Sequence, residues 1–378
     1  MSERLNIALL GAGQLGGSFI LGLREHGADI FVTAYDPATA HSEALKARGG
    51  VDVVCASPEE AVKQVDMVVF AAPLRTYRSL ASAIAPVLTN GTIVTDLGSV
   101  KGSMVAVANI LSLAHIVPAH PIAGSEKSGP LAARGDLFHG KLCILTPDET
   151  NNTEAFQAVE ALWSLVGADV IAMPAEVHDQ IYAYVSHLPH YIAFVAASYF
   201  HARGISVHAD EAMLQQFLRI SRSNPRMWAD VALENREALL PALGTYIALL
   251  EHFVSELRAG EPSDAKADSN ALAKALLPRV LASCLISGVS LYEQQSASNL
   301  RPFGAGGMRD IVAPAALTPE ADTEMMSHNA VAMAEIIEGI IPHFRALESL
   351  IGAEDATALY TRISEMVEDA HQLVALTN

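Results

Sequence analysis

A single histidine, His120, stands in an irregular stretch of small residues, PAHPIAGSEKSGP, at positions 118–130. Three prolines and two glycines among these thirteen residues make the stretch a poor helix. An imidazole titrates near neutral pH, so it suits a group that accepts a proton during a reaction. We expect His120 to be a catalytic base in an active-site loop, rather than the cap of a turn.

A second group of residues has the spacing of a dinucleotide-binding turn. Glycines at 11, 13 and 16 follow an apolar run, and Asp36 ends the next apolar run, 20 residues after Gly16. Gly11 suits a tight turn, Gly13 lets the backbone approach a pyrophosphate, and Gly16 lets a helix pack closely. Asp36 would bind a ribose diol and repel a 2′-phosphate, so NAD is expected as cofactor and NADP is less favoured. The expected cofactor-binding residues are Gly11, Gly13, Gln14, Leu15, Gly16, Asp36 and Pro73.

Apolar runs and helical patterns alternate around these residues. Further strands are expected at 51–54, 67–71 and 92–96, then in HIVPAH, LCILTP and GADVIAM, with helices near 58–64 and 75–88. Such alternation predicts an α/β domain, a doubly wound, Rossmann-type parallel sheet with right-handed crossovers, over residues 1–172. Ligands bind where the strands of such a sheet end, and PAHPIAGSEKSGP begins at such an end.

Beyond residue 172 the pattern becomes helical, with apolar residues at steps of three and four, so an all-α C-terminal domain is expected. An internal duplication is also indicated. HLPHYIAFVAASYF resembles LLPRVLASCLISGV, and Pro225 and Asn235 align with Pro319 and Asn329. The expected segments are a first helical copy (173–260), an exposed polar linker (258–271) and a second helical copy (271–378).

The overall charge and composition exclude several classes of partner. The 378 residues include 42 acidic and 24 basic side chains, a formal net charge of −18, which disfavours nucleic acid. No uncharged apolar run reaches the about 18 residues of a membrane helix, and the N-terminus lacks a signal-peptide layout. Cys55, Cys143 and Cys284 lack metal-site spacing. We expect a soluble cytoplasmic protein without a metal, membrane or nucleic-acid partner.

Five segments occur in a characteristic order: GAGQLGGSF, DLGSVKG, HPIAGSEKSGP, HDQIYAYVSHLPHYIAF and RISRSNPRMWADVALEN. Together they resemble the prephenate and arogenate dehydrogenase family of tyrosine biosynthesis, over about residues 5–260. The resemblance implies oxidative decarboxylation of prephenate to 4-hydroxyphenylpyruvate, or of arogenate to tyrosine, with hydride transfer to NAD(P). The two substrates differ by a keto or amino group, and the sequence leaves that choice open.

The same resemblance implies roles for individual residues. Ser99 in DLGSVKG would orient His120 or contact the nicotinamide, making it the second catalytic candidate; a helix N-cap is its alternative. Arg219, nine residues before Trp228, would bind a carboxylate of the dicarboxylate substrate through two parallel hydrogen bonds. Glu126 matches an acid at the active-site mouth. The expected substrate-binding residues are Arg219, His190, His187, Glu126, Ser125 and Arg309.

Two histidines of SHLPH, His187 and His190, are three residues apart and share a helix face. In the family a histidine of this pair holds the substrate, and His190 is favoured. A metal bound by the pair is a weaker alternative, because no third ligand lies nearby in the sequence.

One family motif is displaced in this chain. Relatives carry a stretch like GGFRD just before the arginine, where this sequence has EAMLQQF. A close match, GAGGMRD, lies at 304–310 in the second copy, which lacks the later arginine and tryptophan. Because the family dimerises through its helical domains, we expect the second copy to act as a partner within one chain, with Arg309 and Asp310 near the first-copy site. A homodimer and a monomer with such a pseudo-dimer both stay open.

Three alternatives are weaker. The chain shows no GxxGxGxxxKxxN stretch, as β-hydroxyacid and 6-phosphogluconate-type dehydrogenases would. It could also be a non-catalytic NAD-binding regulator, but it retains Ser99, His120 and Arg219. A fused chorismate mutase or ACT domain is not expected at either end.

Overall fold

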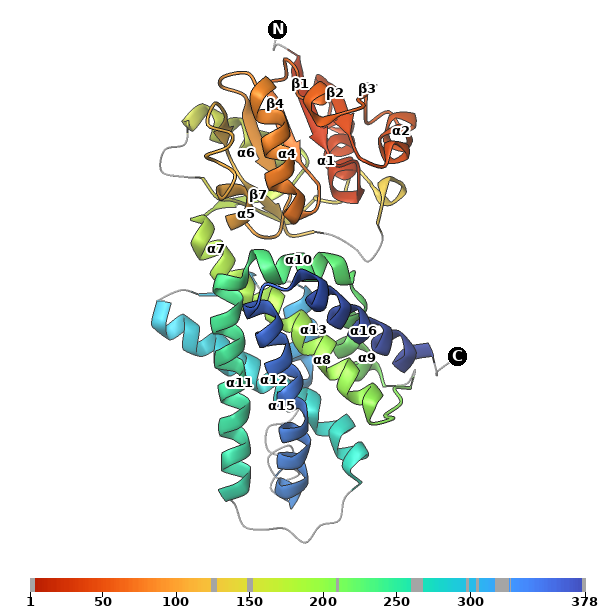
Figure 1. The fold of residues 1–378 in the computed structure, drawn as a ribbon, viewed down its shortest axis with the longest axis vertical. Helices are drawn as coiled ribbons and strands as arrows, with labels where there is room; N and C mark the ends of the chain where they lie inside the picture. The colour runs from red at the N-terminus through yellow and green to blue at the C-terminus, as the bar shows by residue number, and fades with distance from the viewer. Residues whose placement is uncertain are drawn as a thin grey trace. The chain divides into compact units, whose positions relative to one another are not determined.

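The computed structural model divides into two compact units, an α/β unit over residues 1–179 and a helical unit over 180–378 (Figure 1). Ser125, Glu126 and most of the expected linker at 258–271 lie outside the described residues, so what was expected of them stays a prediction. The residues that the structure describes are 4–123, 128–147, 152–208, 211–259, 268–296, 299–303, 306–316, 326 and 328–375.

The α/β unit is built on a six-stranded parallel sheet in the order β3-β2-β1-β4-β5-β6. Its strands are β1 (Leu5–Leu10), β2 (Ile30–Tyr35), β3 (Val53–Val54), β4 (Met67–Phe70), β5 (Ile93–Asp96) and β6 (His115–Ile116). This is the strand order of a dinucleotide-binding fold, with the change of direction between β1 and β4. The predicted Rossmann-type sheet is therefore confirmed.

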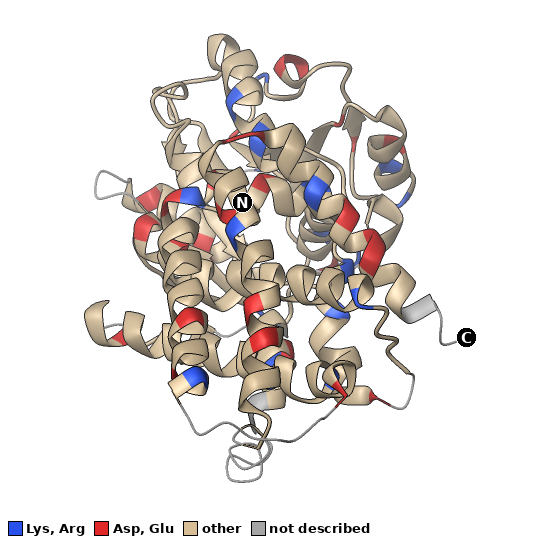
Figure 2. Cartoon of the chain, turned by 60° about the horizontal axis from the view of Figure 1, so that its bottom comes forward, with Lys and Arg blue, Asp and Glu red and all other residues tan. Residues whose placement is uncertain are grey.

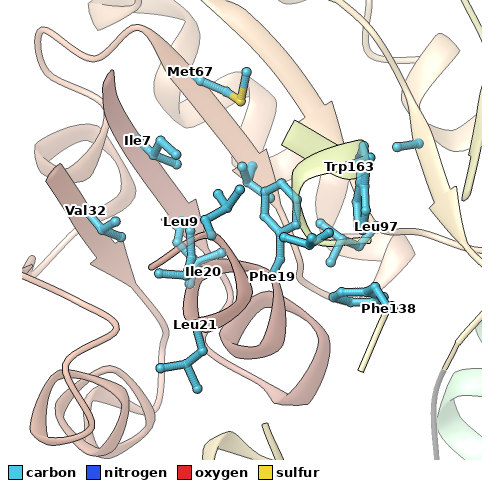
Figure 3. Packing of buried hydrophobic residues seen from close by; sticks show 14 of the residues in the cluster. Ile7, Leu9, Phe19, Ile20, Leu21, Val32, Met67, Leu97, Phe138 and Trp163 are labelled. Carbon is cyan, nitrogen blue, oxygen red and sulfur yellow. The ribbon is translucent and has the colours of Figure 1, made fainter. Parts of the chain in front are cut away.

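Helices cover this sheet and close its core. They are α1 (Gln14–Glu25), α2 (Thr39–Ala47), α3 (Pro58–Ala61), α4 (Tyr77–Ile84), α5 (Gly102–Val105) and α6 (Thr153–Leu165), with short 3₁₀ turns η1 (Leu74–Thr76), η2 (Ala85–Val87) and η3 (Pro130–Ala132). Phe19 of α1 lies 4.5 Å from the ring of Trp163 on α6, and Phe138 meets the same ring edge-on at 5.1 Å (Figure 3). Burial of such large side chains stabilises the unit by about 1.5–3 kcal/mol each.

The later strands do not extend the main sheet, so that part of the sequence prediction was wrong. β7 (Ala119–Pro121), β8 (Leu142–Leu145) and β9 (Asp169–Ala172) form a separate three-stranded sheet, in which β7 is antiparallel to β8. Pro118 separates β6 from β7 and has no N–H to continue the ladder of β6. His120 therefore lies on a paired strand, opposite Ile144, rather than in an irregular loop.

The second unit is helical throughout its described residues. Its elements are η4 (Ala183–His187, a π-helical turn), α8 (Leu188–Ala202), α9 (Ala212–Leu218), η5 (Arg219–Arg222), α10 (Pro225–Glu234), α11 (Arg236–Ala259), α12 (Ser269–Ser296), η6 (Arg301–Phe303), α13 (Gly306–Val312), η7 (Ala313–Ala316), α15 (Ala330–Gly352) and α16 (Ala356–Ala375). Helix α7 (Ala175–Tyr182) runs across the division between the units. Almost every residue of α8 is buried, so this helix forms the centre of the helical unit.

Two helices, α11 and α12, are long and apolar enough to cross a membrane, by length and composition only. Core helices of soluble proteins pass the same test, and 67% of the apolar span of α12 is buried inside the unit, against 39% for α11. Acidic residues are spaced along several helices among fewer Lys and Arg residues (Figure 2). These observations are weak evidence for membrane contact.

Candidate active site

The glycine turn after β1 has the geometry that a dinucleotide needs. Gly11 has φ +107°, and a Cβ there would lie 2.4 Å from the carbonyl oxygen of Ala71. A Cβ on Gly16 would lie 2.6 Å from the carbonyl oxygen of Gly11, so α1 packs tightly on the turn. A Cβ on Gly13 would meet nothing within 4 Å. Gly13 is also the N-cap of α1 and leaves the first N–H groups of that helix without a side-chain cap, which suits a phosphate.

Asp36 ties the end of β2 to this turn. Its carboxylate accepts hydrogen bonds from the backbone N–H groups of Ala12 and Ala38, both at 2.9 Å. His41 lies 3.4 Å from the same carboxylate. The Asp36 side chain is 12% exposed, so it faces the turn while keeping some access to solvent. The acid therefore stands where a ribose next to the pyrophosphate would need a hydrogen-bond acceptor.

The remaining expected cofactor residues lie on the elements around the turn. Gln14 and Leu15 are half-buried at the start of α1, and Pro73 is exposed at the start of η1, after β4. Their contacts with a cofactor stay a prediction. The open position at Gly13 and the uncapped α1 N-terminus are the observations that fit a dinucleotide.

His120 begins a chain of three side chains within the first unit. Its Nδ1 atom lies 2.8 Å from Nε2 of His178, with the two ring centroids 5.0 Å apart. The Nδ1 atom of His178 lies 2.8 Å from Oδ1 of Asp179. The Asp179 carboxylate also accepts hydrogen bonds from the backbone N–H groups of Lys101 and Gly102, at 2.8 Å each. The chain therefore joins β7, α7 and the turn before α5.

The protonation states along this chain follow from burial and charge. Burial lowers the pKa of His178, although the neighbouring carboxylate opposes that shift, so the ring is neutral at neutral pH. Burial would raise the pKa of Asp179, but hydrogen bonds from His178 and the two backbone N–H groups lower it. An ionised carboxylate only accepts, so His178 holds its proton on Nδ1 and accepts through Nε2. The neutral His120 ring then donates from Nδ1 and keeps its lone pair on Nε2, the form of a general base.

A buried ion pair anchors the turn DLGSVKG beside this chain. Nζ of Lys101 lies 2.7 Å from each carboxylate oxygen of Asp96 and 2.5 Å from the carbonyl oxygen of Ala119. Both charged side chains are fully buried. Since Ala119 precedes His120, this structural contact fixes β7 against β5. Ser99 lies partly exposed in the same turn, does not cap α5, and makes no hydrogen bond to a described residue.

Sequence reasoning missed two members of the chain of side chains, His178 and Asp179. Both belong to the segment HDQIYAYVSHLPHYIAF, which was recognised as a motif without a role for its first two residues. An adjacent histidine and aspartate at the start of a helix was the available signal. The structure describes no group of three or more metal-ligating side chains within its described residues.

In the helical unit, His190 lies in a tightly packed position. Its ring stacks on Trp228 with centroids 3.7 Å apart, and its Nδ1 atom donates to the carbonyl oxygen of Ser186 at 2.8 Å. Burial lowers the pKa of His190 to about 3, so the ring is neutral. Its Nε2 atom is therefore a hydrogen-bond acceptor, which suits a hydroxyl or ammonium donor of a ligand better than a carboxylate. The π-helical turn η4 just before it is a feature common at functional sites.

The second histidine of SHLPH has a different environment. His187 is buried, and its Nδ1 atom accepts a hydrogen bond from Nδ2 of Asn235 at 2.9 Å. Its ring meets Trp228 edge-on at 6.1 Å. This position supports the aromatic cluster, and contact of His187 with a substrate stays a prediction.

Arg219 forms an ion pair with the displaced motif of the second copy. Its Nε atom donates to Oδ2 of Asp310 at 2.9 Å, and its Nη2 atom contacts the same oxygen. The arginine side chain is 53% exposed, whereas that of Asp310 is 9% exposed. Arg309 lies on the exposed side of α13, and its expected role in substrate binding stays a prediction.

Comparisons with known proteins agree on one family. The family model described as prephenate dehydrogenase, nucleotide-binding domain, matches residues 19–172, and the prephenate dehydrogenase dimerization domain matches twice, at 174–276 and 266–365. A cyclohexadienyl dehydrogenase from Zymomonas mobilis is 32% identical over 71% of this chain and 91% of its own. A prephenate dehydrogenase from Bacillus subtilis is 29% identical over 64% of this chain and 67% of its own.

A solved structure supports the same relation. The crystal structure of prephenate dehydrogenase from A. aeolicus, in complex with hydroxyphenyl propionate and NAD+, aligns with a TM-score of 0.60 and 33% identity. The alignment covers 67% of this chain and 90% of that chain.

Proposed function

Because this chain belongs to the prephenate dehydrogenase family, we propose that it converts prephenate to 4-hydroxyphenylpyruvate in tyrosine biosynthesis, with NAD as cofactor. The observation that carries the proposal is the chain His120–His178–Asp179, which prepares a base in the unit that holds the glycine turn. Relatives named prephenate dehydrogenase support the reaction, and the solved relative with bound NAD+ supports the cofactor.

The reaction needs a base at the ring hydroxyl of the substrate. The substrate ring carries a hydroxyl at C4 and a carboxylate at C1. We assign the hydroxyl proton to Nε2 of His120, so that C4 becomes a carbonyl carbon as its hydride departs. The bond between C1 and the carboxylate then breaks, carbon dioxide leaves, and its electron pair completes the aromatic ring. NAD, when bound, supplies the hydride acceptor.

The other two side chains of the chain prepare and then stabilise the base. Before proton transfer, His178 holds His120 in the tautomer with a lone pair on Nε2. After transfer, the imidazolium of His120 faces a neutral ring that is backed by the Asp179 carboxylate. This is the role that a carboxylate plays behind a catalytic histidine, here extended by one imidazole. Ser99 lies in the turn that Asp179 holds through Lys101, and we keep it as a supporting residue.

The helical unit offers two different groups for the substrate. The exposed guanidinium of Arg219 would bind a carboxylate, since a fork of N–H donors matches two carboxylate oxygens. The neutral ring of His190 would accept a hydrogen bond from a donor. Together they suit a ligand that carries both carboxylate and hydroxyl groups.

Arogenate is the second candidate substrate. One relative is named for the cyclohexadienyl ring, which prephenate and arogenate share. Both would use the same base and lose the same carboxylate, so the difference concerns only the side-chain keto or amino group.

Two further properties belong to the same proposal. The duplicate match to a dimerization domain supports assembly through the helical unit, either between two chains or between two copies in one chain. Relatives that act on small biosynthetic intermediates support a cytoplasmic location.

Initial rates with prephenate and with arogenate, each with NAD and with NADP, test the proposal. We expect NADH formation at 340 nm with prephenate, matched by release of carbon dioxide. NAD binding without turnover of either substrate would instead support a non-catalytic NAD-binding protein.

A further inference from the structure

The helical unit contains two sets of helices that match element by element. A shift of 94 residues, which brings Pro225 to Pro319, also brings α9 to α13, η5 to η7 and the start of α11 to the start of α15. The match extends to the bounds of the shorter elements: Ala212–Leu218 becomes Gly306–Val312, and Arg219–Arg222 becomes Ala313–Ala316. The two matches to one dimerization-domain model fit the same division.

Equivalent helices of the two sets pack against each other. Helix α11 packs along α15, α9 contacts α13, and α8 contacts α12. Tyr246 of α11 and Phe344 of α15 place their rings 5.3 Å apart, and Arg258 of α11 pairs with Glu338 of α15 at 2.8 Å. Contacts between like elements are what a two-fold interface between identical subunits produces. The unit therefore has the internal arrangement of a dimer within one chain.

The two sets have kept different polar residues at equivalent positions. The first set has Arg219 where the second has Ala313. The second set has Asp310 where the first has Gln216. His190 of SHLPH has Arg279 as its equivalent in LLPR. A symmetric pair would form two like sites, whereas these losses leave one complete set of groups.

The retained groups meet at one place. Asp310 accepts hydrogen bonds from Nε of Arg219 at 2.9 Å and from Nε2 of Gln216 at 3.3 Å. A Cβ on Gly307 would lie 3.0 Å from Cε1 of His190, so glycine lets α13 approach the histidine ring. The equivalent of Gly307 in the first set is Met213, whose side chain could not occupy that space.

We infer that the second helical copy completes the substrate-binding groups of the first within the same chain, with Asp310 as a positioning residue for Arg219. The inference rests on the proposed function, because it assigns Arg219 to a substrate carboxylate. Asp310 engages Nε and Nη2, which orients the guanidinium and leaves the donors of Nη1 to a ligand. Gln216 keeps the carboxylate in place with an amide donor. The reciprocal position, with Ala313 and Arg279, binds no substrate.

Steady-state kinetics of acid-to-amide variants test the inference. We expect Asp310→Asn to raise KM about tenfold with kcat changed by less than about threefold, as expected when binding rather than chemistry is weakened. The double variant Gln216→Glu with Asp310→Asn returns a carboxylate to the cluster and should recover most of the lost KM. Glu338→Gln is the matched control, because it breaks an ion pair between the same two copies at the exposed α11–α15 contact. An unchanged or lowered KM in Asp310→Asn would overturn the inference, and so would failure of the double variant to recover while it stays folded.

Co-expression of Arg219→Ala chains with Asp310→Asn chains, each with its own tag, separates completion within a chain from completion between chains. We expect the doubly tagged or mixed protein to have only the mean activity of the two variants. Recovery above that mean would show that the groups come from different chains and would refute the inference. Calorimetric binding of 4-hydroxyphenylpyruvate, the proposed product, repeats the comparison without turnover. An inactive wild-type chain would defeat the proposed function, whereas an active wild type with unchanged Asp310→Asn binding would defeat only this inference.

Discussion

Replacing Asp179 with asparagine should slow the chemical step more than it weakens substrate binding. Oδ1 of Asp179 accepts from His178 and from the backbone of Lys101, while Oδ2 accepts from the backbone of Gly102. Asparagine offers one acceptor oxygen and one NH₂ donor, so it cannot satisfy all three donors. Turning the NH₂ group toward His178 would reverse the tautomers along the chain and place a proton on Nε2 of His120.

The charge that is lost sets a lower limit on the effect. From the 2.8 Å contact and the 5.0 Å ring separation, the Asp179 carboxylate lies about 8 Å from the His120 ring. A unit charge at that distance, at an effective dielectric constant of about 20, stabilises the imidazolium by about 2 kcal/mol. This converts to a fall in kcat of about thirtyfold, and reversed tautomers would add to it.

The pH profile of kcat/KM distinguishes this role from a purely structural one. Loss of the negative charge disfavours the protonated form of His120, so the base stays deprotonated to lower pH. The acid limb of the profile should therefore move to lower pH, by about 1.5 units for about 2 kcal/mol. Tyr77→Phe is the control, since it removes a 3.1 Å contact to Asp96 beside the same turn without touching the chain of imidazoles.

Stopped-flow measurement of NADH formation, with thermal unfolding to check the fold, completes the assay. A folded Asp179→Asn protein with near wild-type kcat and an unmoved acid limb would refute the reasoning. Loss of activity with an unmoved acid limb, equal to the loss in Tyr77→Phe, would reduce Asp179 to a support of the turn.

Four other substitutions have distinct expected outcomes. His120→Asn should lower kcat by roughly 10²–10⁴-fold, while NAD affinity measured by fluorescence titration stays near normal; collapsed NAD binding would make the histidine structural. Arg219→Ala should raise KM for the substrate with little change in kcat, and an unchanged KM would remove it from the site. Asp36→Ala should raise the ratio of kcat/KM with NADP to that with NAD, because a 2′-phosphate would no longer meet a carboxylate; an unchanged ratio would contradict its assigned role. Lys101→Met should cost about 3–5 kcal/mol of stability in denaturant unfolding, because Asp96 would be a buried charge without its partner; a cost below about 1 kcal/mol would contradict that reasoning.

The first half of the fold was predictable because its information is local. The spacing of Gly11, Gly13, Gly16 and Asp36 constrains a strand, a turn and a helix that are close in the sequence. The separate sheet of β7, β8 and β9 was not predictable in the same way. Its pairing joins residues more than twenty positions apart, and an apolar run looks the same in either sheet.

The candidate site shows the same division between local and distant information. His120 and Arg219 stood out because their surrounding motifs carry them. His178 acts on a side chain 58 positions away, a relation that only the folded chain reveals. On α13, Asp310 faces Arg219 while Arg309 is exposed, because successive helical side chains point in different directions.

Doubling of the helical set within one gene also changes how this interface can evolve. In a dimer of identical subunits, every substitution appears on both sides of the axis and must be tolerated twice. Here α11 and α15 are encoded separately, so a mutation alters one side only and the other can drift, specialise or compensate. The chain is thus free of the mirror-like constraint that keeps the halves of a symmetric enzyme alike.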